Sequence, residues 1–266
     1  MQEYTVFPQL NIKTQEFWEE VQKENTKIKG EQIITYMMLM LRKANQVSLR
    51  ISKSDLGKMA SKVQYFSGVT TFFPRINKFV EKESNNKIKV RHYIISSGLK
   101  EILSRTKIKD YFYNIFASEY YYNHYGAPIY PKLVVTDTVK TQFLFRINKG
   151  REKLTESINE FMDEGDRPIP FSNIVYIGDG ITNVPCMTVT TKNGGYSIAV
   201  FNRRKRKSLQ VCKMLFKNAR VDYIAEADYN TDSDLDKFLK IILKTIMQGI
   251  IFYNKQRDMV IRRNIK

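Results

Sequence analysis

The sequence has little cysteine, no long apolar run and no leader-like start, and each absence narrows the class of protein. Its 266 residues include two cysteines, Cys186 in a loop-like stretch and Cys212 in a helical pattern, so we expect a reducing compartment and no disulfide framework. The most apolar stretch, residues 238–252, is interrupted by polar residues and is shorter than the roughly 18 residues of a membrane-spanning helix. The first residues include no basic segment followed by an apolar one. We therefore expect a cytoplasmic protein without a membrane partner.

Positive charge exceeds negative charge along the chain. Lysine and arginine number 44 against 27 aspartates and glutamates, which gives a net charge of +17 and raises the question of an anionic partner. Only residues 203–207 form a dense basic run, which we interpret as a solvated loop leading into a helix. We expect small phosphorylated molecules as ligands and no specific nucleic acid. Nucleic-acid binding through residues 203–207 and the tyrosines at 120–122 is an alternative.

Apolar residues recur at helical spacing through the first quarter of the chain, and strands alternate with helices after it. The spacing predicts early helices over residues 14–25, 31–44 and 54–67. Another helix, around residues 72–80, has a proline in its first turn, and a hairpin or an excursion of the chain is expected within residues 119–136. The predicted strands are 90–95, 113–118, 174–177, 197–200 and 221–224, and the later helices include 138–149, 151–163 and a long one from about residue 232. This alternation predicts an α/β fold with a parallel sheet and right-handed crossovers.

Residues 174–187 carry the most specific signal in the chain. Residues 174–177 are apolar and β-prone and predict a short strand buried on both faces. The strand stops at Gly178-Asp179-Gly180, where the glycines permit a tight turn that brings backbone N–H groups near whatever the acid binds. Asp179 then stands at the carboxyl end of a strand, where open α/β sheets place ligands, and its carboxylate suits Mg²⁺. The simpler interpretation is that Asp179 stabilises its own turn.

Two further polar features follow strands or begin helices in the same α/β pattern. Ser96-Ser97-Gly98 ends one predicted strand and would offer hydroxyl and N–H groups at a helix N-terminus, which suits phosphate. Lys140 opens a predicted helix and could reach the same place. Each feature alone has a simple explanation, a helix cap for the serine and a solvated side chain for the lysine. The order Ser, Lys, Asp at the ends of α/β elements is more specific than any one of them.

With these motifs in this order, the chain resembles the haloacid dehalogenase-like (HAD) superfamily, and within it the phosphoserine-phosphatase-like branch. Residues 175–185 are similar to the family's fourth motif, residues 93–98 to its second, and residues 137–141 contain a candidate for its third. The resemblance covers most of the chain. It implies a Rossmann-like parallel sheet core with an α-helical cap, and we assign residues 1–71 to the cap and residues 72–266 to the core.

The resemblance also implies a reaction, the Mg²⁺-dependent hydrolysis of a phosphomonoester. The site residues that it implies are Ser96, Ser97 and Gly98 for the phosphate, Lys140 and Asp179 for catalysis, and Asp179 and Asn183 for the metal. The substrate is selected by cap residues in this superfamily, and the sequence does not identify it.

Two features depart from the family's pattern. The motif Asp-x-Asp-x-Thr, which supplies the nucleophile and the general acid/base in the family, is absent, and Asn183 stands where a second acid is usual. A Mg²⁺ site left with Asp179 alone is expected to be weak or absent. We therefore predict no aspartyl-phosphate chemistry for this chain. The alternative is a non-catalytic HAD-like module that binds a phosphorylated ligand.

The absent motif implies that the central first strand of the sheet is missing, between the strands at 90–95 and 174–177. Its loss would leave backbone groups unpaired at about 1–3 kcal/mol each, against a total stability of about 5–15 kcal/mol. We therefore hypothesise that the sequence is truncated at its N-terminus. The sequence predicts no oligomeric state.

Overall fold

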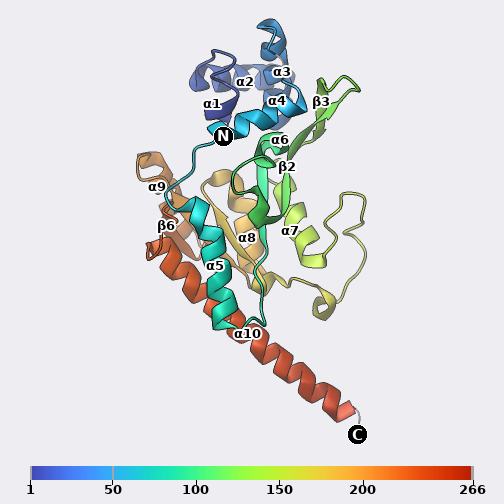
Figure 1. The fold of residues 1–266 in the computed structure, drawn as a ribbon, viewed down its shortest axis with the longest axis vertical. Helices are drawn as coiled ribbons and strands as arrows, with labels where there is room; N and C mark the ends of the chain where they lie inside the picture. Colours follow the sequence, from blue (N-terminus) through green and yellow to red (C-terminus); the bar gives the residue numbers. More distant parts are fainter. Residues whose placement is uncertain (1, 50, 265–266) are drawn as a thin grey trace. The chain divides into compact units, whose positions relative to one another are not determined.

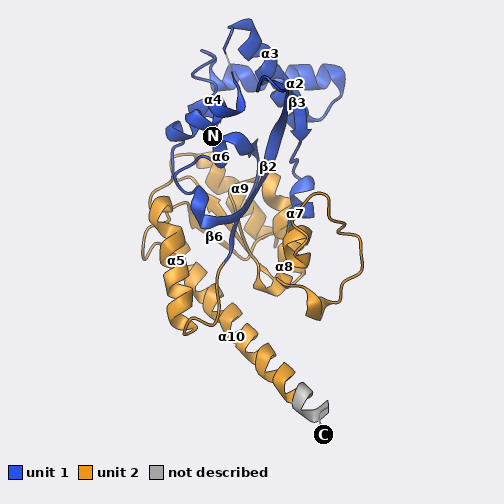
Figure 2. Ribbon diagram, turned by 45° about the vertical axis from the view of Figure 1, so that its right-hand side comes forward, with its two compact units in different colours: residues 1–65, 91–143 blue, residues 66–90, 144–266 orange. Residues whose placement is uncertain are grey.

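The computed structural model describes residues 2–49 and 51–264, which form two compact units (Figure 2). Unit 1 consists of residues 1–65 and 91–143, and unit 2 of residues 66–90 and 144–266. Each unit has its own parallel strands and its own buried apolar cluster. The units therefore do not divide at residue 71, because residues 91–143 pack with the N-terminal helices. The assignment of residues 1–71 as a cap over a core of residues 72–266 stays a prediction.

Unit 1 combines helices with a three-stranded sheet (Figure 1). Its elements are α1 (Gln2–Thr5), α2 (Thr14–Ile28), α3 (Gln32–Gln46), α4 (Lys53–Lys58), η1 (Met59–Lys62), β1 (His92–Leu99), α6 (Lys100–Leu103), η2 (Lys109–Tyr111), β2 (Phe112–Tyr122), β3 (Pro128–Leu133) and the start of α7 (Val139–Lys149). Strand β1 runs parallel to β2, and β2 pairs with β3 as an antiparallel hairpin. The helices predicted over 14–25 and 31–44 are confirmed, whereas the one predicted over 54–67 ends at Lys62.

The core of unit 1 explains why these helices and the hairpin hold together. Phe7 and Phe17 pack with ring centroids 4.4 Å apart, and Tyr36 of α3 contacts the Trp18 ring. Tyr120 of β2 is buried in the same cluster, and its hydroxyl donates a hydrogen bond of 2.8 Å to the carbonyl of Met37. The predicted hairpin within 119–136 is confirmed, and Tyr120 is a core residue of unit 1.

The predicted end of the strand at Ser96-Ser97-Gly98 is wrong. Strand β1 continues through these residues to Leu99, and the helix that follows, α6, has four residues. Ser96 pairs with Ala117 and Leu99 with Ser118, so Ser97 and Gly98 form an irregularity in the ladder within the strand. Helix α6 begins directly after the strand, at Lys100.

Unit 2 is built on a parallel sheet with strand order β4-β5-β6. Its elements are α5 (Val69–Glu83), the end of α7, η3 (Glu164–Asp166), η4 (Phe171–Asn173), β4 (Val175–Gly178), η5 (Ile181–Asn183), α8 (Val184–Lys192), β5 (Tyr196–Phe201), α9 (Arg206–Lys217), β6 (Tyr223–Glu226) and α10 (Asp234–Asn264). The strands predicted at 174–177 and 197–200 are confirmed, and the one at 221–224 lies two residues later. The α/β fold class is confirmed.

Alternating residues of β5 show how helices cover both faces of this sheet. Ile198 and Val200 join an apolar cluster with α5 and the first half of α10, and Figure 1 shows these two helices side by side. Ser197 points to the other face, where its hydroxyl donates to the carbonyl of Met187 in α8. On the α5 side, buried Asp236 of α10 accepts a hydrogen bond of 2.9 Å from Arg75.

The second of the two predicted helices after residue 137 is wrong. Helix α7 ends at Lys149 as expected, but residues 151–163 form an irregular loop. Buried Arg146 donates hydrogen bonds to four carbonyl groups of this loop, and Lys149 donates to two more. A helix over 151–163 would use several of these carbonyls in its own backbone bonds, so the two cations of α7 favour the loop.

Within the described ranges, no helix has both the length and the apolar character needed to cross a membrane. Helix α10 is the longest, with 31 residues, and residues 252–260 within it are all exposed. Strands β1 and β4 each pair with a single strand among the described residues. The gap predicted at the centre of the sheet stays a prediction.

Candidate active site at the end of strand β4

Strand β4 ends where the sequence predicts, and a close contact fixes that end. A Cβ atom on Gly178 would lie 2.9 Å from side-chain atoms of both Asn183 and Met187, which is closer than Cβ atoms approach other heavy atoms. The absence of a side chain therefore lets η5 and α8 pack directly against the strand end. Asp179 follows immediately, and its side chain is exposed.

Two consecutive hydrogen bonds link the Asp179 carboxylate to buried side chains of the strand end. The hydroxyl of Tyr176 in β4 donates to Oδ1 of Asn183 at 2.8 Å, and Nδ2 of Asn183 donates to Oδ1 of Asp179 at 3.3 Å. Tyr176 and Asn183 are both buried, so the relay is sheltered from water. In this arrangement Asn183 positions Asp179 and turns its donor, not its oxygen, toward the carboxylate.

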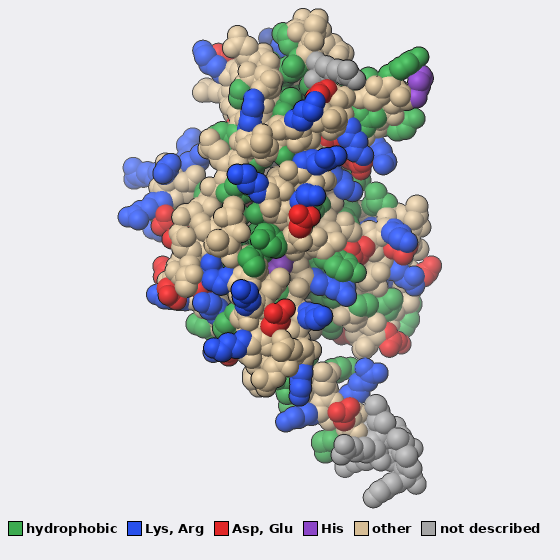
Figure 3. Space-filling view, viewed as in Figure 1, with side chains coloured by type: hydrophobic (Ala, Val, Ile, Leu, Met, Phe, Trp, Pro, Cys, Tyr) green, Lys and Arg blue, Asp and Glu red, His purple; other side chains and the backbone are tan. Residues whose placement is uncertain are grey.

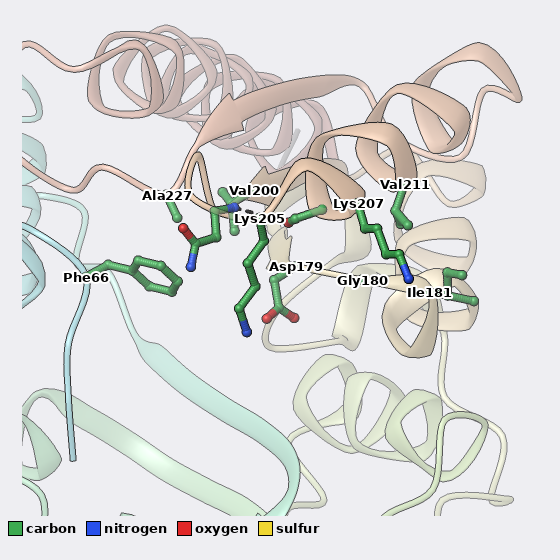
Figure 4. Close-up of a pocket in the computed structure, with 11 residues that line it drawn as sticks. Phe66, Asp179, Gly180, Ile181, Val200, Lys205, Lys207, Val211 and Ala227 are labelled. Carbon is green, nitrogen blue, oxygen red and sulfur yellow. Dashed lines mark hydrogen bonds between the residues drawn. The ribbon is translucent and has the colours of Figure 1, made fainter. Parts of the chain in front are cut away.

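A hollow of about 380 Å³ lies over this end of the sheet (Figure 4). Its polar lining consists of Asp179, Asn202, Lys205, Lys207 and Ser208, and its apolar lining of Phe66, Ile181, Val200, Val211 and Ala227, with Gly180 between them. All of these residues belong to unit 2. The hollow therefore places one carboxylate and two ammonium groups beside an apolar wall.

The two lysines come from the basic run at 203–207. Lys205 precedes α9, Lys207 lies in its first turn, and in Figure 4 the Lys205 side chain extends alongside the Asp179 carboxylate. Arg203 instead forms an ion pair of 3.9 Å with Glu226. The run does lead into a helix, as predicted, but sequence reasoning missed that two of its lysines line a hollow. The available signal was its place after β5, at the same edge of the sheet as Asp179.

The positive charge on the face seen in Figure 3 is dispersed. Figure 3 shows lysine and arginine side chains spread over the visible face, with acidic side chains among them. This matches the scattered lysines of the sequence, and the prediction that no specific nucleic acid binds stays a prediction.

The charge of Asp179 affects two neighbouring groups. Burial, and secondarily the Asp179 carboxylate, raise the pKa of the Cys212 thiol in α9 to about 11. The same two causes raise the pKa of Tyr229 to about 12. Both groups stay protonated at neutral pH. Asp179 is the one carboxylate among the side chains that line the hollow.

The described residues supply only part of a Mg²⁺ site. They contain no group of three or more histidine, cysteine, aspartate and glutamate side chains that could hold a metal ion. Mg²⁺ requires several oxygen ligands, which proteins often complete with substrate phosphate and water. Asp179 provides one such oxygen ligand, and Asn183 Oδ1 already accepts a hydrogen bond from Tyr176. The protein residues here do not fit a complete metal site of their own.

The other predicted site residues belong to unit 1. The hydroxyl of Ser96 accepts a hydrogen bond of 3.0 Å from the N–H of Gly98, and the carbonyl of Ser97 accepts one from Tyr36. Lys140 is the second residue of α7 and is buried. The structure thus brings Asp179 and Asn183 together in unit 2, and it places Ser96, Ser97, Gly98 and Lys140 in unit 1. Their roles toward a phosphate stay predictions.

Comparison with known proteins identifies a family relative. No family model matches the chain. An uncharacterized protein of Borreliella burgdorferi is 31% identical over 198 residues, which cover 68% of this chain and 67% of that protein. The chain belongs to the same family as this Borreliella protein. Membership does not itself assign an activity.

Among solved structures, the chain is similar to a HAD family hydrolase from Salmonella enterica serovar Typhi. The TM-score is 0.53 at 16% identity, and the match covers 89% of this chain and 64% of the Salmonella chain. A protein of unknown function from Bordetella pertussis Tohama I is also similar, with a TM-score of 0.35 at 10% identity over 84% of this chain and 94% of that one. The Salmonella match shows that this chain has a HAD-like α/β fold. The chain spans less than two thirds of the length of the Salmonella chain.

Proposed function

We propose that the protein binds a phosphorylated small molecule in the Asp179 hollow, and that it belongs to a HAD-like group of phosphomonoester hydrolases. The observation that carries the proposal is the grouping of Lys205 and Lys207 with Asp179 at the carboxyl end of a parallel sheet, where α/β proteins bind their ligands. Ammonium groups form strong hydrogen bonds with phosphate oxygens. The hydroxyl of Ser208 and the amide of Asn202 add neutral partners.

In this proposal each side chain of the hollow has a defined task. Lys205 and Lys207 neutralise and orient the phosphate, and Asn183 holds Asp179 toward it. Asp179 is the one carboxylate of the hollow that could offer an oxygen to Mg²⁺, and an ion held there would neutralise further charge on the phosphate. Because Asp179 is the single carboxylate of the hollow, the side chains of the hollow bind and orient the ligand but supply no second acid to serve as nucleophile.

We place the protein in the cytoplasm, since both cysteines are buried and neither forms a disulfide.

A second candidate is a non-catalytic module that binds the same ligand without hydrolysing it. The lone carboxylate of the hollow favours it, because aspartyl-phosphate chemistry needs a nucleophile in addition to a metal ligand. The two candidates share the binding site and differ in whether phosphate is released.

Isothermal titration of the full chain with glycerol 3-phosphate and inorganic phosphate tests the shared site. Substitution Lys205→Gln removes one charged partner of the phosphate, and we expect affinity to fall about tenfold. Lys213→Gln is the matched control, because Lys213 is exposed on α9 outside the hollow, and it should change affinity less than twofold. Absence of binding, or equal losses in the two variants, would contradict the proposal.

Phosphate release by the same preparation separates the two candidates. We expect no Mg²⁺-dependent release from this chain. Release that disappears in Asp179→Asn would instead show that the chain is a hydrolase in its own right, since a contaminating phosphatase would be unaffected by that substitution.

A further inference from the structure

One side of the Asp179 hollow is lined by apolar side chains, and the binding of phosphate does not require them. Phe66 is 42% exposed, although large apolar side chains are usually buried. Its ring extends toward Lys205 in Figure 4. Ile181, Val200 and Val211 continue the apolar lining, so a ligand held at the lysines would have its organic part against this wall.

The chain next to Phe66 is fixed in place by a clasp to the segment between β6 and α10. The N–H of Tyr229 donates to the carbonyl of Ser67 at 2.9 Å, and the Asn230 side chain donates to the Ser67 hydroxyl at 2.6 Å. Gly68 adopts φ +78°, and a Cβ on it would lie 2.4 Å from backbone atoms of Tyr229 and Asn230. Only glycine permits both this backbone conformation and this approach. The exposed ring therefore stands on a backbone that is held in place at the two residues that follow it.

Charge and shape together define the ligand class. An exposed aromatic ring gains most from a flat apolar partner, since rings stack in offset or edge-on arrangements. The lysines lie on the polar side of the same hollow. A volume of about 380 Å³ is within the range of small-ligand pockets.

We propose that the hollow selects phosphomonoesters whose organic group is aromatic, with the phosphate at Lys205 and Lys207 and the aromatic ring against Phe66. This inference rests on the proposed phosphate site and adds the substrate class. Phe66 is the specificity-determining residue in it, and its contribution is confined to the organic part of the ligand.

Three probes test the inference by isothermal titration of the full chain: phenyl phosphate, ethyl phosphate and inorganic phosphate. The native protein should bind phenyl phosphate about tenfold more tightly than ethyl phosphate. Phe66→Ala should reduce this preference to less than threefold and leave the affinity for inorganic phosphate unchanged. Phe216→Ala is the matched control, because Phe216 is 52% exposed on α9 and does not line the hollow; it should keep the full preference.

The outcomes separate the inference from the function on which it rests. Equal affinities of the native protein for phenyl and ethyl phosphate would overturn the inference and leave the phosphate site intact. An equal loss of affinity for all three probes in Phe66→Ala would also overturn it, because Phe66 would then support the fold of the site and not the choice of ligand. Failure of the native protein to bind any probe would overturn the proposed function itself.

Discussion

Strands β1 and β4 have residues of similar character near their carboxyl ends, but the two ends differ in structure. Both strands are apolar and are followed by small polar residues and glycine, Ser96-Ser97-Gly98 in one and Gly178-Asp179-Gly180 in the other. Strand β4 stops at its glycine and exposes Asp179, whereas β1 continues through its serines to Leu99. A strand with small polar residues near its end can therefore stop at its glycine or continue past it.

The difference lies in what packs behind each strand end. Behind β4, η5 and the nine-residue helix α8 approach so closely that Gly178 has no room for a side chain, and Asn183 reaches Asp179 from within this packing. Behind β1, the helix α6 has only four residues, and the Ser96 hydroxyl is used by the nearby N–H of Gly98. Three experiments test this contrast.

The largest effect is expected from Gly178→Ala. The new methyl group would lie 2.9 Å from Asn183 and Met187, and such overpacking costs about 1–3 kcal/mol of the free energy of unfolding. Urea denaturation measures the loss. Gly180→Ala is the control, because a Cβ there has no heavy atom within 4 Å, and we expect a change below about 0.5 kcal/mol. Equal stability of the two variants would show that the close packing behind β4 is not what ends the strand.

A smaller effect is expected from Ser96→Ala at the end of β1. The substitution removes the acceptor of the Gly98 N–H, which should lower the free energy of unfolding by about 1 kcal/mol. The affinity for inorganic phosphate should change less than twofold, because the hydroxyl serves its own strand. A loss of affinity as large as that of Lys205→Gln would instead support the phosphate-binding role that the family resemblance implies for Ser96.

The smallest effect is expected from the charge of Asp179, at the end of β4, on the pH dependence of stability. Because the native state raises the pKa of Cys212 from 9.0 to about 11, it keeps a proton that the unfolded chain releases within this interval, so stability should fall as pH rises from about 9 to 11. Asp179→Asn removes the secondary cause of the shift and should make the fall shallower, while burial maintains the rest. Denaturant titrations at several pH values measure this slope. Asp110→Asn, which removes an exposed charge in unit 1, should leave the slope unchanged.

Local patterns predicted the parts of the site that depend on neighbouring residues in the chain. The strand at 174–177, the turn at Asp179 and the parallel pairing followed from apolar runs and glycine positions, and the HAD-like fold followed from motif order. Lys205 and Lys207 were visible as charges, but their place in the hollow depends on where β5 ends relative to β4, and this is a tertiary property. Phe66 carried no local signal, because its position depends on the hydrogen bonds of the neighbouring Ser67 with Tyr229 and Asn230, more than 160 residues away.

The errors have a common physical origin. Residues 151–163 have helical spacing, but Arg146 and Lys149 bind the carbonyls that such a helix would need. At β1, the pairing with β2 extends the strand beyond the point where the local sequence predicts a turn. In both places a partner outside the segment decided the conformation of the backbone, and such partners are not visible in a local pattern.

Helix α10 has a consequence for the way the molecule loses structure. Its first half is packed in the core of unit 2, but residues 252–260 are all exposed. The helical structure of these exposed residues therefore depends on propagation from the packed turns before them. Each turn within residues 252–260 is stable only while the turn before it remains helical. Residues 252–260 should therefore lose their helical structure before the packed first half of the helix does, and residue 252 marks where cooperative unfolding of the core gives way to local unfolding.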